Sequence, residues 1–423
     1  MKAGLVALAF LMAEAHAQQP EPLLQQAEAA LQKQDYAGAA QALETYLTLQ
    51  PNDYRAEFNL AYAYSFLGRR AEAIRRYQNV LSREKDLAQA HLNLGILLLE
   101  DGNAAEAAEH LRVVVEQQPN NAKASFPLAQ ALSALHRTEE ARALYERLLN
   151  LQPDHAPAHF ALGKLLAQTD PAAAEKHLRR ALELDPSLEE TRLLLAAVLE
   201  TRAAQGAETL EEAAAIYRQT LDTHPQRHDI RVRLGQVYAQ QKRFSDAAKQ
   251  WEIVRAAGDS SPELAQALLQ VYLQSPGGEK EKALPVVQEI LAQDPGNSEL
   301  WLLAGRLWME KKQYPEAAQR FRQVTELRPE WAQGYTNLAS ALYLLKDYEG
   351  TVAALAKVGQ LRQDTPGTYF LRAISLDKLH QRQQAVENYQ RFLEADGEKN
   401  PDQEFQARQR IRILSRELQK GYK

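Results

Sequence analysis

An alanine that recurs every 34 residues constrains this chain of 423 residues more than any other feature of its sequence. Its first four members are Ala39, Ala73, Ala107 and Ala141, and similar text surrounds each, such as DYAGAAQAL and NAAEAAEHL. Seven later members follow at nearly the same interval: Ala174, Ala213, Ala247, Ala283, Ala317, Thr351 and Ala385. Self-similarity at a fixed period predicts a stacked repeat protein, in which each unit buries apolar surface against its neighbours.

Two further series keep the same register. A small residue stands twelve positions before most of these alanines, and Leu269 is the exception. A proline closes many of the units: Pro51, Pro119, Pro153, Pro186, Pro225, Pro295 and Pro329. The apolar residues between these markers have helical spacing, as in 56–67 and 71–82, so each unit is predicted to hold two amphipathic helices. The small residues would let the helices approach closely, and the proline would end the second helix.

A bulky residue follows four positions after most of the alanines. Tyr77, Tyr145 and Phe321 are examples, and we expect them to fill the gap toward the neighbouring unit. Two stretches depart from the period. Residues 201–209 are an addition to their unit, and SPGGEK (275–280) extends another, so both predict longer turns between helices.

This pattern resembles the tetratricopeptide repeat, a helix–turn–helix unit of 34 residues. The best match is the unit 298–331, which carries Trp301, Gly305, Ala317, Phe321 and Pro329 at the family's positions. The resemblance implies an all-α fold, a right-handed superhelical α-solenoid of about eleven helix–turn–helix repeats with a C-terminal capping helix. The solenoid would span 18–399, in the units 20–53, 54–87, 88–121, 122–155, 156–188, 189–227, 228–261, 262–297, 298–331, 332–365 and 366–399.

The capping helix is expected in the C-terminal segment 400–423. Ile411, Leu414 and Leu418 would form its apolar stripe, and polar residues would cover its other faces. Solenoids need such a polar-backed element to shield their last open face. The basic residues Arg408, Arg410, Arg412 and Arg416 of this segment could touch an anionic surface, but a solvated face interleaved with acids is the favoured interpretation.

Residues 1–17 (MKAGLVALAFLMAEAHA) have the three parts of a secretory signal peptide. Lys2 supplies the positive start, residues 3–12 are apolar but too short to span a bilayer, and Ala15-His16-Ala17 is a cleavage signal. Cleavage after Ala17 would make the protein periplasmic or secreted. The alternatives are an apolar first helix of the fold, or an uncleaved segment that leaves the protein cytoplasmic or tethered to a membrane.

The composition argues against several kinds of chemistry. The chain has no cysteine, which excludes disulfides and cysteine zinc sites, and its net charge of −5 does not suit nucleic acid. No phosphate loop, G-x-S-x-G or H-E-x-x-H motif is present. Two histidine pairs have i,i+4 spacing, but a proline lies inside each, so a structural role is favoured over a metal site: His155/His159 and His224/His228. We therefore predict no catalytic residues, no cofactor, no metal and no enzymatic activity.

The resemblance implies that positions 2, 5, 9 and 12 of each unit face a concave groove. In units two to five these positions are largely apolar, and the predicted partner-binding residues are Phe58, Tyr62, Leu92, Ile96, Leu99, Phe126 and Phe160. Position 5 is often bulky in this family, so Tyr62 and Ile96, at the more variable position 9, are the stronger evidence. Units seven to nine offer a more charged lining, with Asp229, Val232, Gln236, Glu299, Leu302 and Arg306.

The favoured function is a non-catalytic scaffold for protein–protein interaction in the bacterial periplasm or cell envelope. It would bind partner peptides or amphipathic helices in the concave groove, in assembly of an envelope, export or secretion complex. We expect no nucleic-acid partner and no transmembrane segment, with peripheral association with the envelope left open. The alternative is a non-catalytic or site-sharing subunit of an envelope enzyme complex. The sequence does not identify the partner or the oligomeric state.

Overall fold

The computed structural model describes residues 20–202, 206–275 and 280–421. All regular secondary structure in these ranges is α-helical, which confirms the predicted fold class. The predicted signal peptide, residues 1–17, lies outside the described residues, as do residues 203–205 and 276–279 of the two extended turns. Among the described helices, none combines the length and the apolar character that crossing a bilayer would need.

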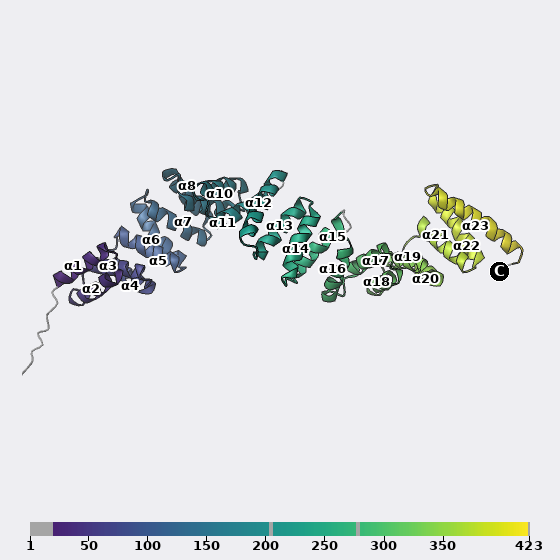
Figure 1. Ribbon diagram of the computed structural model, residues 1–423, viewed down its shortest axis with the longest axis horizontal. Helices are drawn as coiled ribbons and strands as arrows, with labels where there is room; N and C mark the ends of the chain where they lie inside the picture. Colours follow the sequence, from purple (N-terminus) through teal and green to yellow (C-terminus); the bar gives the residue numbers. More distant parts are fainter. Residues whose placement is uncertain (1–19, 203–205, 276–279, 422–423) are drawn as a thin grey trace, which may run out of the picture. The chain divides into compact units, whose positions relative to one another are not determined.

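The chain divides into two compact bodies, which we call the N-terminal body (Met1–Ile216) and the C-terminal body (Tyr217–Lys423). Within each body the helices follow one another as antiparallel hairpins, and two helices fall within each expected unit range (Figure 1). The helices before the division are α1 (Pro20–Gln32), α2 (Tyr36–Leu49), α3 (Tyr54–Phe66), α4 (Arg70–Arg83), α5 (Ala88–Glu100), α6 (Ala104–Gln117), α7 (Ala122–Ala134), α8 (Thr138–Leu151), α9 (Ala156–Leu166), α10 (Pro171–Leu184) and α11 (Glu189–Thr201).

Helix α12 (Ala207–Thr223) contains the division. The C-terminal body continues with α13 (His228–Gln240), α14 (Phe244–Ala256), α15 (Pro262–Gln274), α16 (Lys280–Gln293), α17 (Ser298–Glu310), α18 (Tyr314–Leu327), α19 (Ala332–Leu344), α20 (Tyr348–Leu361), α21 (Pro366–Lys378), α22 (Arg382–Asp396) and α23 (Pro401–Gln419). Odd-numbered helices from α1 to α21 are the first helices of their hairpins, and even-numbered helices are the second.

The ends of the helices follow from local chemistry. Asp53 caps α3 by accepting hydrogen bonds from the backbone N–H groups of Arg55 and Ala56, which helix geometry leaves without partners. Pro51 and Pro119 stand two residues beyond the ends of α2 and α6, as the sequence predicted for the closing prolines. Helix α4 lacks such a proline and still ends in the same register, so the stacking of the units also fixes where the second helices stop.

The turn inside most hairpins is a Schellman motif. After α19, the Lys346 N–H donates to the Tyr343 carbonyl at 2.9 Å and the Asp347 N–H donates to the Leu342 carbonyl at 3.0 Å. The motif requires a left-handed residue, and this residue is a glycine in only two of these turns. The left-handed positions are Gln34, Gly68, Gly102, His136, Lys242, Lys312, Lys346 and His380.

Where the first helix carries a glycine at the small-residue position, the packing of the hairpin requires it. A Cβ on Gly95 would lie 2.6 Å from Leu111 Cγ, and a Cβ on Gly305 would overlap the Phe321 ring. The bulky residue therefore covers the small residue of its own unit, whereas the sequence suggested the neighbouring unit. Tyr77 contacts both units, because its ring lies 5.4 Å from that of Phe58 in its own unit and its hydroxyl accepts a hydrogen bond from Asn93 of the next unit at 2.9 Å.

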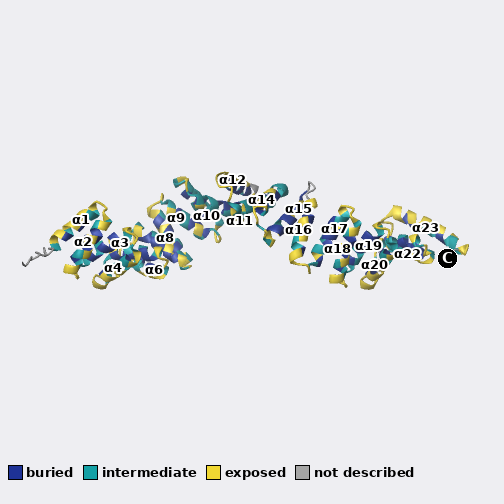
Figure 2. Cartoon of the chain, turned by 60° about the horizontal axis from the view of Figure 1, so that its bottom comes forward, coloured by how far each residue is buried: buried dark blue, intermediate teal, exposed yellow. Residues whose placement is uncertain are grey.

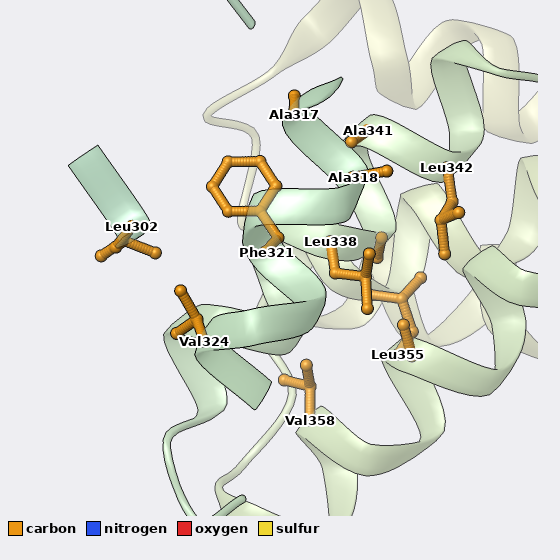
Figure 3. Packing of buried hydrophobic residues seen from close by; sticks show 12 residues of the cluster. Leu302, Ala317, Ala318, Phe321, Val324, Leu338, Ala341, Leu342, Leu355 and Val358 are labelled. Atoms are coloured by element: carbon orange, nitrogen blue, oxygen red, sulfur yellow. The ribbon is translucent and has the colours of Figure 1, made fainter. Parts of the chain in front are cut away.

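The core runs between the helices of adjacent hairpins. Figure 3 shows Phe321 and Val324 of α18 between Leu302 of α17 and the side chains of α19 and α20, where Leu338 and Leu355 continue the cluster. Buried residues lie where helices face each other, and exposed residues lie on turns and outward helix faces (Figure 2). Burial of this apolar surface is what holds one hairpin to the next.

Candidate partner-binding surface

An exposed aromatic cluster lies where the first and second hairpins of the N-terminal body meet. The rings of Tyr36 and Phe66 stack with centroids 4.4 Å apart, and the Tyr62 ring lies 4.9 Å from that of Phe66. Tyr62 is 37% exposed and Phe66 is 56% exposed. Exposed aromatic side chains held rigidly together are typical of binding surfaces, since they offer contact area at a low entropic cost.

The cluster forms one wall of a pocket between α3 and α5. The pocket has a volume of about 280 Å³, and its lining brings Tyr62 and Ile96 together, with Phe66 and Leu97 beside them. Ser65, Asn93 and Glu100 add polar groups to the lining. The two position-9 residues singled out in the sequence thus share one apolar hollow with a polar edge.

Phe66 and Tyr36 were not among the predicted residues. Phe66 is the last residue of α3 and Tyr36 is the first residue of α2, so neither falls on the groove positions that the resemblance supplies. The available signal was the presence of an aromatic residue at each of these helix ends. Leu67, next to Phe66, is a further exposed apolar side chain there.

The other predicted groove residues belong partly to the core. Phe58 packs edge-on against Tyr77, with ring centroids 5.4 Å apart, and Phe126 lies 6.0 Å from the Tyr145 ring. Leu92 is only 6% exposed and offers little surface to a partner. Leu99 and Phe160 are half-buried, and the Lys164 ammonium lies 5.5 Å from the Phe160 ring centroid.

The C-terminal body has a pocket at the corresponding place, between α13 and α15. Its volume is about 390 Å³, and its lining includes Val232 and Leu264 but also Gln236, Gln240 and Gln270. Asp229, expected in a charged groove, forms an ion pair with Arg227 at 2.7 Å. Asp259 and Glu263 add acidic groups to this lining, whereas Glu100 is the acidic residue that lines the pocket of the N-terminal body.

The histidines form pairs that the sequence did not suggest. His159 lies beside His177 of α10, with 3.0 Å between their Nδ1 atoms, and His91 lies beside His110 of α6 at 2.9 Å. Burial, followed by the neighbouring histidine, lowers the pKa of His110 and of His177. The Nδ1 of His155 instead accepts from the Ala158 N–H and caps α9.

The outer nitrogen of the first-helix histidine in each pair meets a backbone carbonyl six residues back. His91 Nε2 lies 2.7 Å from the Lys85 oxygen, and His159 Nε2 lies 2.9 Å from the Pro153 oxygen. Since a carbonyl only accepts, the histidine donates. Position 4 of other units makes the same contact, in Arg192 to Pro186, Arg231 to Pro225 and Trp301 to Pro295. These contacts tie the first helix to the preceding turn through the histidine side chain. Within the described ranges, no three side chains of metal-binding type come together.

The fold and this surface define a helical-hairpin repeat protein with an apolar hollow between first helices. One family model of the tetratricopeptide repeat matches residues 98–164 and 278–342. A second family model of the same repeat matches residues 24–65, 58–122 and 198–262. Together these matches cover well over half of the chain. The chain belongs to the tetratricopeptide repeat family, whose members bind protein partners.

Two curated relatives share part of this sequence. Human protein O-mannosyl-transferase TMTC1 is 26% identical over 182 residues, which are 42% of this chain and 20% of that protein. The formate-dependent nitrite reductase complex subunit NrfG of Escherichia coli O157:H7 is 28% identical over 117 residues, 27% of this chain and 59% of that protein. The matched segments thus span less than two thirds of either relative.

Solved structures with a similar fold include other repeat proteins. MamA from Desulfovibrio magneticus RS-1 is 21% identical with a TM-score of 0.38, covering 41% of this chain and 99% of that one. A thermophilic tetratricopeptide repeat protein from Thermus thermophilus is 24% identical with a TM-score of 0.33, covering 44% of this chain and 99% of that one. The TM-scores are low in both cases.

Proposed function

We propose that this protein is a non-catalytic scaffold that binds protein partners through the pocket between α3 and α5. The partner would be a peptide or an amphipathic helix with an apolar anchor. The observation that carries the proposal is the aromatic cluster of Tyr36, Tyr62 and Phe66, in which Tyr62 and Phe66 stay exposed beside an apolar hollow. Anchors of this kind dominate the affinity of interfaces, and the residues around them exclude water.

We further propose that the scaffold works in the bacterial periplasm or cell envelope, in assembly of an envelope, export or secretion complex. The order of charge, apolar run and A-x-A in residues 1–17 supports secretion. Mass spectrometry of the protein recovered from its native host tests this. A mature chain beginning at Gln18 is the expected result, and an intact Met1 would contradict it.

The binding proposal is tested with the double variant Tyr62→Glu/Ile96→Glu, which places two charges in the pocket. Its matched control is Gln236→Glu/Gln270→Glu, which alters position 9 in two consecutive units of the C-terminal body and also lines a pocket. Partners captured from envelope extract by the wild type and the control, and lost from the pocket variant, are the expected result. Equal capture by all three proteins would rule out this pocket as the binding site.

A second candidate is a subunit of an envelope enzyme complex. The match to NrfG favours it, because that relative is by name a subunit of a nitrite reductase complex. Capture of a catalytic chain through the same pocket would support this version. Turnover by the purified chain alone would contradict both versions, since each assigns it no chemistry of its own.

A further inference from the structure

Helix α23 is buried along one stripe only. Ala407 and Leu414 are buried against the core of the last repeat, with Ile411 and Leu418 packed beside them. The bidentate ion pair between Arg410 and Asp377, at 2.6 and 2.7 Å, holds the same side of the helix toward α21. The helix is therefore fixed in its rotation, and its opposite side faces outward along its whole length of about 28 Å.

The outward side is cationic with apolar side chains set into it. Arg408, Arg412, Arg416 and Lys420 follow at intervals of four residues, which places them along one side of the helix. Arg408 bonds to Glu404 at 3.1 Å and remains largely exposed, while Arg412 and Arg416 have no acidic partner among the described residues. The sequence grouped Arg410 with these basic residues, but the structure turns it inward.

Two apolar side chains project from the same side. Phe405 is 67% exposed and Ile413 is 42% exposed. In a helix Phe405 points between Arg412 and Arg416, and Ile413 lies beside the basic row, next to the direction of Lys420. A polar-backed cap has no need of an exposed phenylalanine. The combination of a basic row and protruding apolar side chains is typical of helices that lie in the headgroup region of a membrane.

We propose that the outward side of α23 is a peripheral membrane-binding surface that recognises anionic phospholipid headgroups. The basic row supplies the attraction, and Phe405 inserts between the headgroups. The surface is convex, so it suits a plane of headgroups better than it suits a protein partner, for which a hollow would receive an anchor. This surface is separate from the pocket between α3 and α5, so either proposal can fail without the other.

The test is flotation of the purified full chain with lipid vesicles. We expect binding to vesicles of phosphatidylglycerol and phosphatidylcholine, and none to phosphatidylcholine alone. Raising the salt from about 0.1 M to about 1 M shortens the Debye length from roughly 10 Å to roughly 3 Å and should release the protein. Arg412→Glu/Arg416→Glu should weaken binding at least about 30-fold, since each basic residue near an anionic surface contributes about 1 kcal/mol.

The matched control is Arg75→Glu/Arg322→Glu, which makes the same change of net charge on exposed residues of α4 and α18. It should bind as the wild type does, and any contribution from residues 1–17 is common to all variants. Phe405→Ser should weaken binding about threefold to tenfold with little change in salt dependence. Circular dichroism melting of each variant establishes that α23 stays folded.

Equal binding by wild type and Arg412→Glu/Arg416→Glu would overturn the proposal, and so would binding that ignores lipid charge. Absence of binding to every vesicle would also overturn it and would leave this side of α23 to an acidic protein partner. A loss confined to the α23 variants, with the control unaffected, is the supporting result.

Discussion

The pocket between α3 and α5 and the pocket between α13 and α15 occupy the same place in the repeat, but their walls differ. Tyr62 and Ile96 line the first, and Gln236 and Gln270, at the equivalent positions, line the second. The packing positions beneath them are alike, with Gly95 against Leu111 in one body and Gly235 against Trp251 in the other. Packing thus fixes a few positions of each unit and leaves the groove positions free to vary.

The contact at position 4 is likewise kept in several units although the side chain that makes it differs. In the N-terminal body His91, His159 and Arg192 donate to a carbonyl six residues back, and in the C-terminal body Arg231 and Trp301 do so. The repeat requires a donor of sufficient reach at this place and accepts three kinds of side chain. Only the histidine version carries a partner histidine and therefore a dependence on pH.

The largest expected effect is on the free energy of unfolding, and it compares substitutions at two adjacent residues, one at a packing position and one at a groove position. Gly305→Leu should lower the free energy of unfolding by about 3 kcal/mol, because any side chain there overlaps the Phe321 ring. Arg306→Leu, one residue later and exposed, should change it by less than about 0.5 kcal/mol. Urea unfolding followed by tryptophan fluorescence measures both. Similar free energies of unfolding for the two variants would show that the assigned repeat register is wrong.

A smaller effect distinguishes the two bodies by pH. His110 and His177 have a lowered pKa in the folded state, so the unfolded chain binds protons more readily as the pH falls below about 6.5. The stability of the N-terminal body is then fully present above that pH and declines as the pH falls toward the lowered folded-state pKa values. Glu106 and Glu109 near His110, and Glu146 near His177, oppose the decline, and Lys176 adds to it.

The four tryptophans all lie in the C-terminal body, at Trp251, Trp301, Trp308 and Trp331, so fluorescence reports that body alone. On lowering the pH from about 7.5 to about 5.5, we expect the midpoint of thermal unfolding measured by circular dichroism to fall by a few degrees. The midpoint measured by tryptophan fluorescence should not fall with it. His110→Asn/His177→Asn, which keeps a donor without the titration, should reduce this loss. An identical shift in both signals would contradict the assignment to the histidine pairs.

The periodicity of alanine, small residue and proline predicted the hairpins well, because small residues are needed where two helix backbones come close and proline ends a helix. The sequence also singled out Tyr62 and Ile96 at a variable position, and the structure places both in one pocket, while partner binding there stays a prediction. It missed Phe66 and Tyr36, which meet only once α2 and α3 are packed. It also missed the pairing of His159 with His177, because the pair joins two helices and has no fixed spacing along the chain.

The smallest expected effect concerns the turns inside the hairpins. Turns in the two bodies share one backbone geometry but can carry different residues at the left-handed position. Lys346 adopts a left-handed conformation that Gly102 also adopts, and both close a Schellman motif. A residue with a Cβ in this conformation costs roughly 1 kcal/mol. Lys346 is exposed, so Lys346→Gly should raise the stability of the C-terminal body by about 0.5–1 kcal/mol.

The reverse exchange, Gly102→Ala, should lower the stability of the N-terminal body by about 1 kcal/mol, because an added Cβ disfavours the left-handed backbone conformation of this residue. The site has open space around it, so no steric clash adds to this cost. Urea unfolding read by fluorescence for the first variant and by circular dichroism for the second gives both signs. A loss of stability in Lys346→Gly would mean that the lysine side chain contributes more than its backbone conformation costs, and the turns would then depend on side chains as the grooves do.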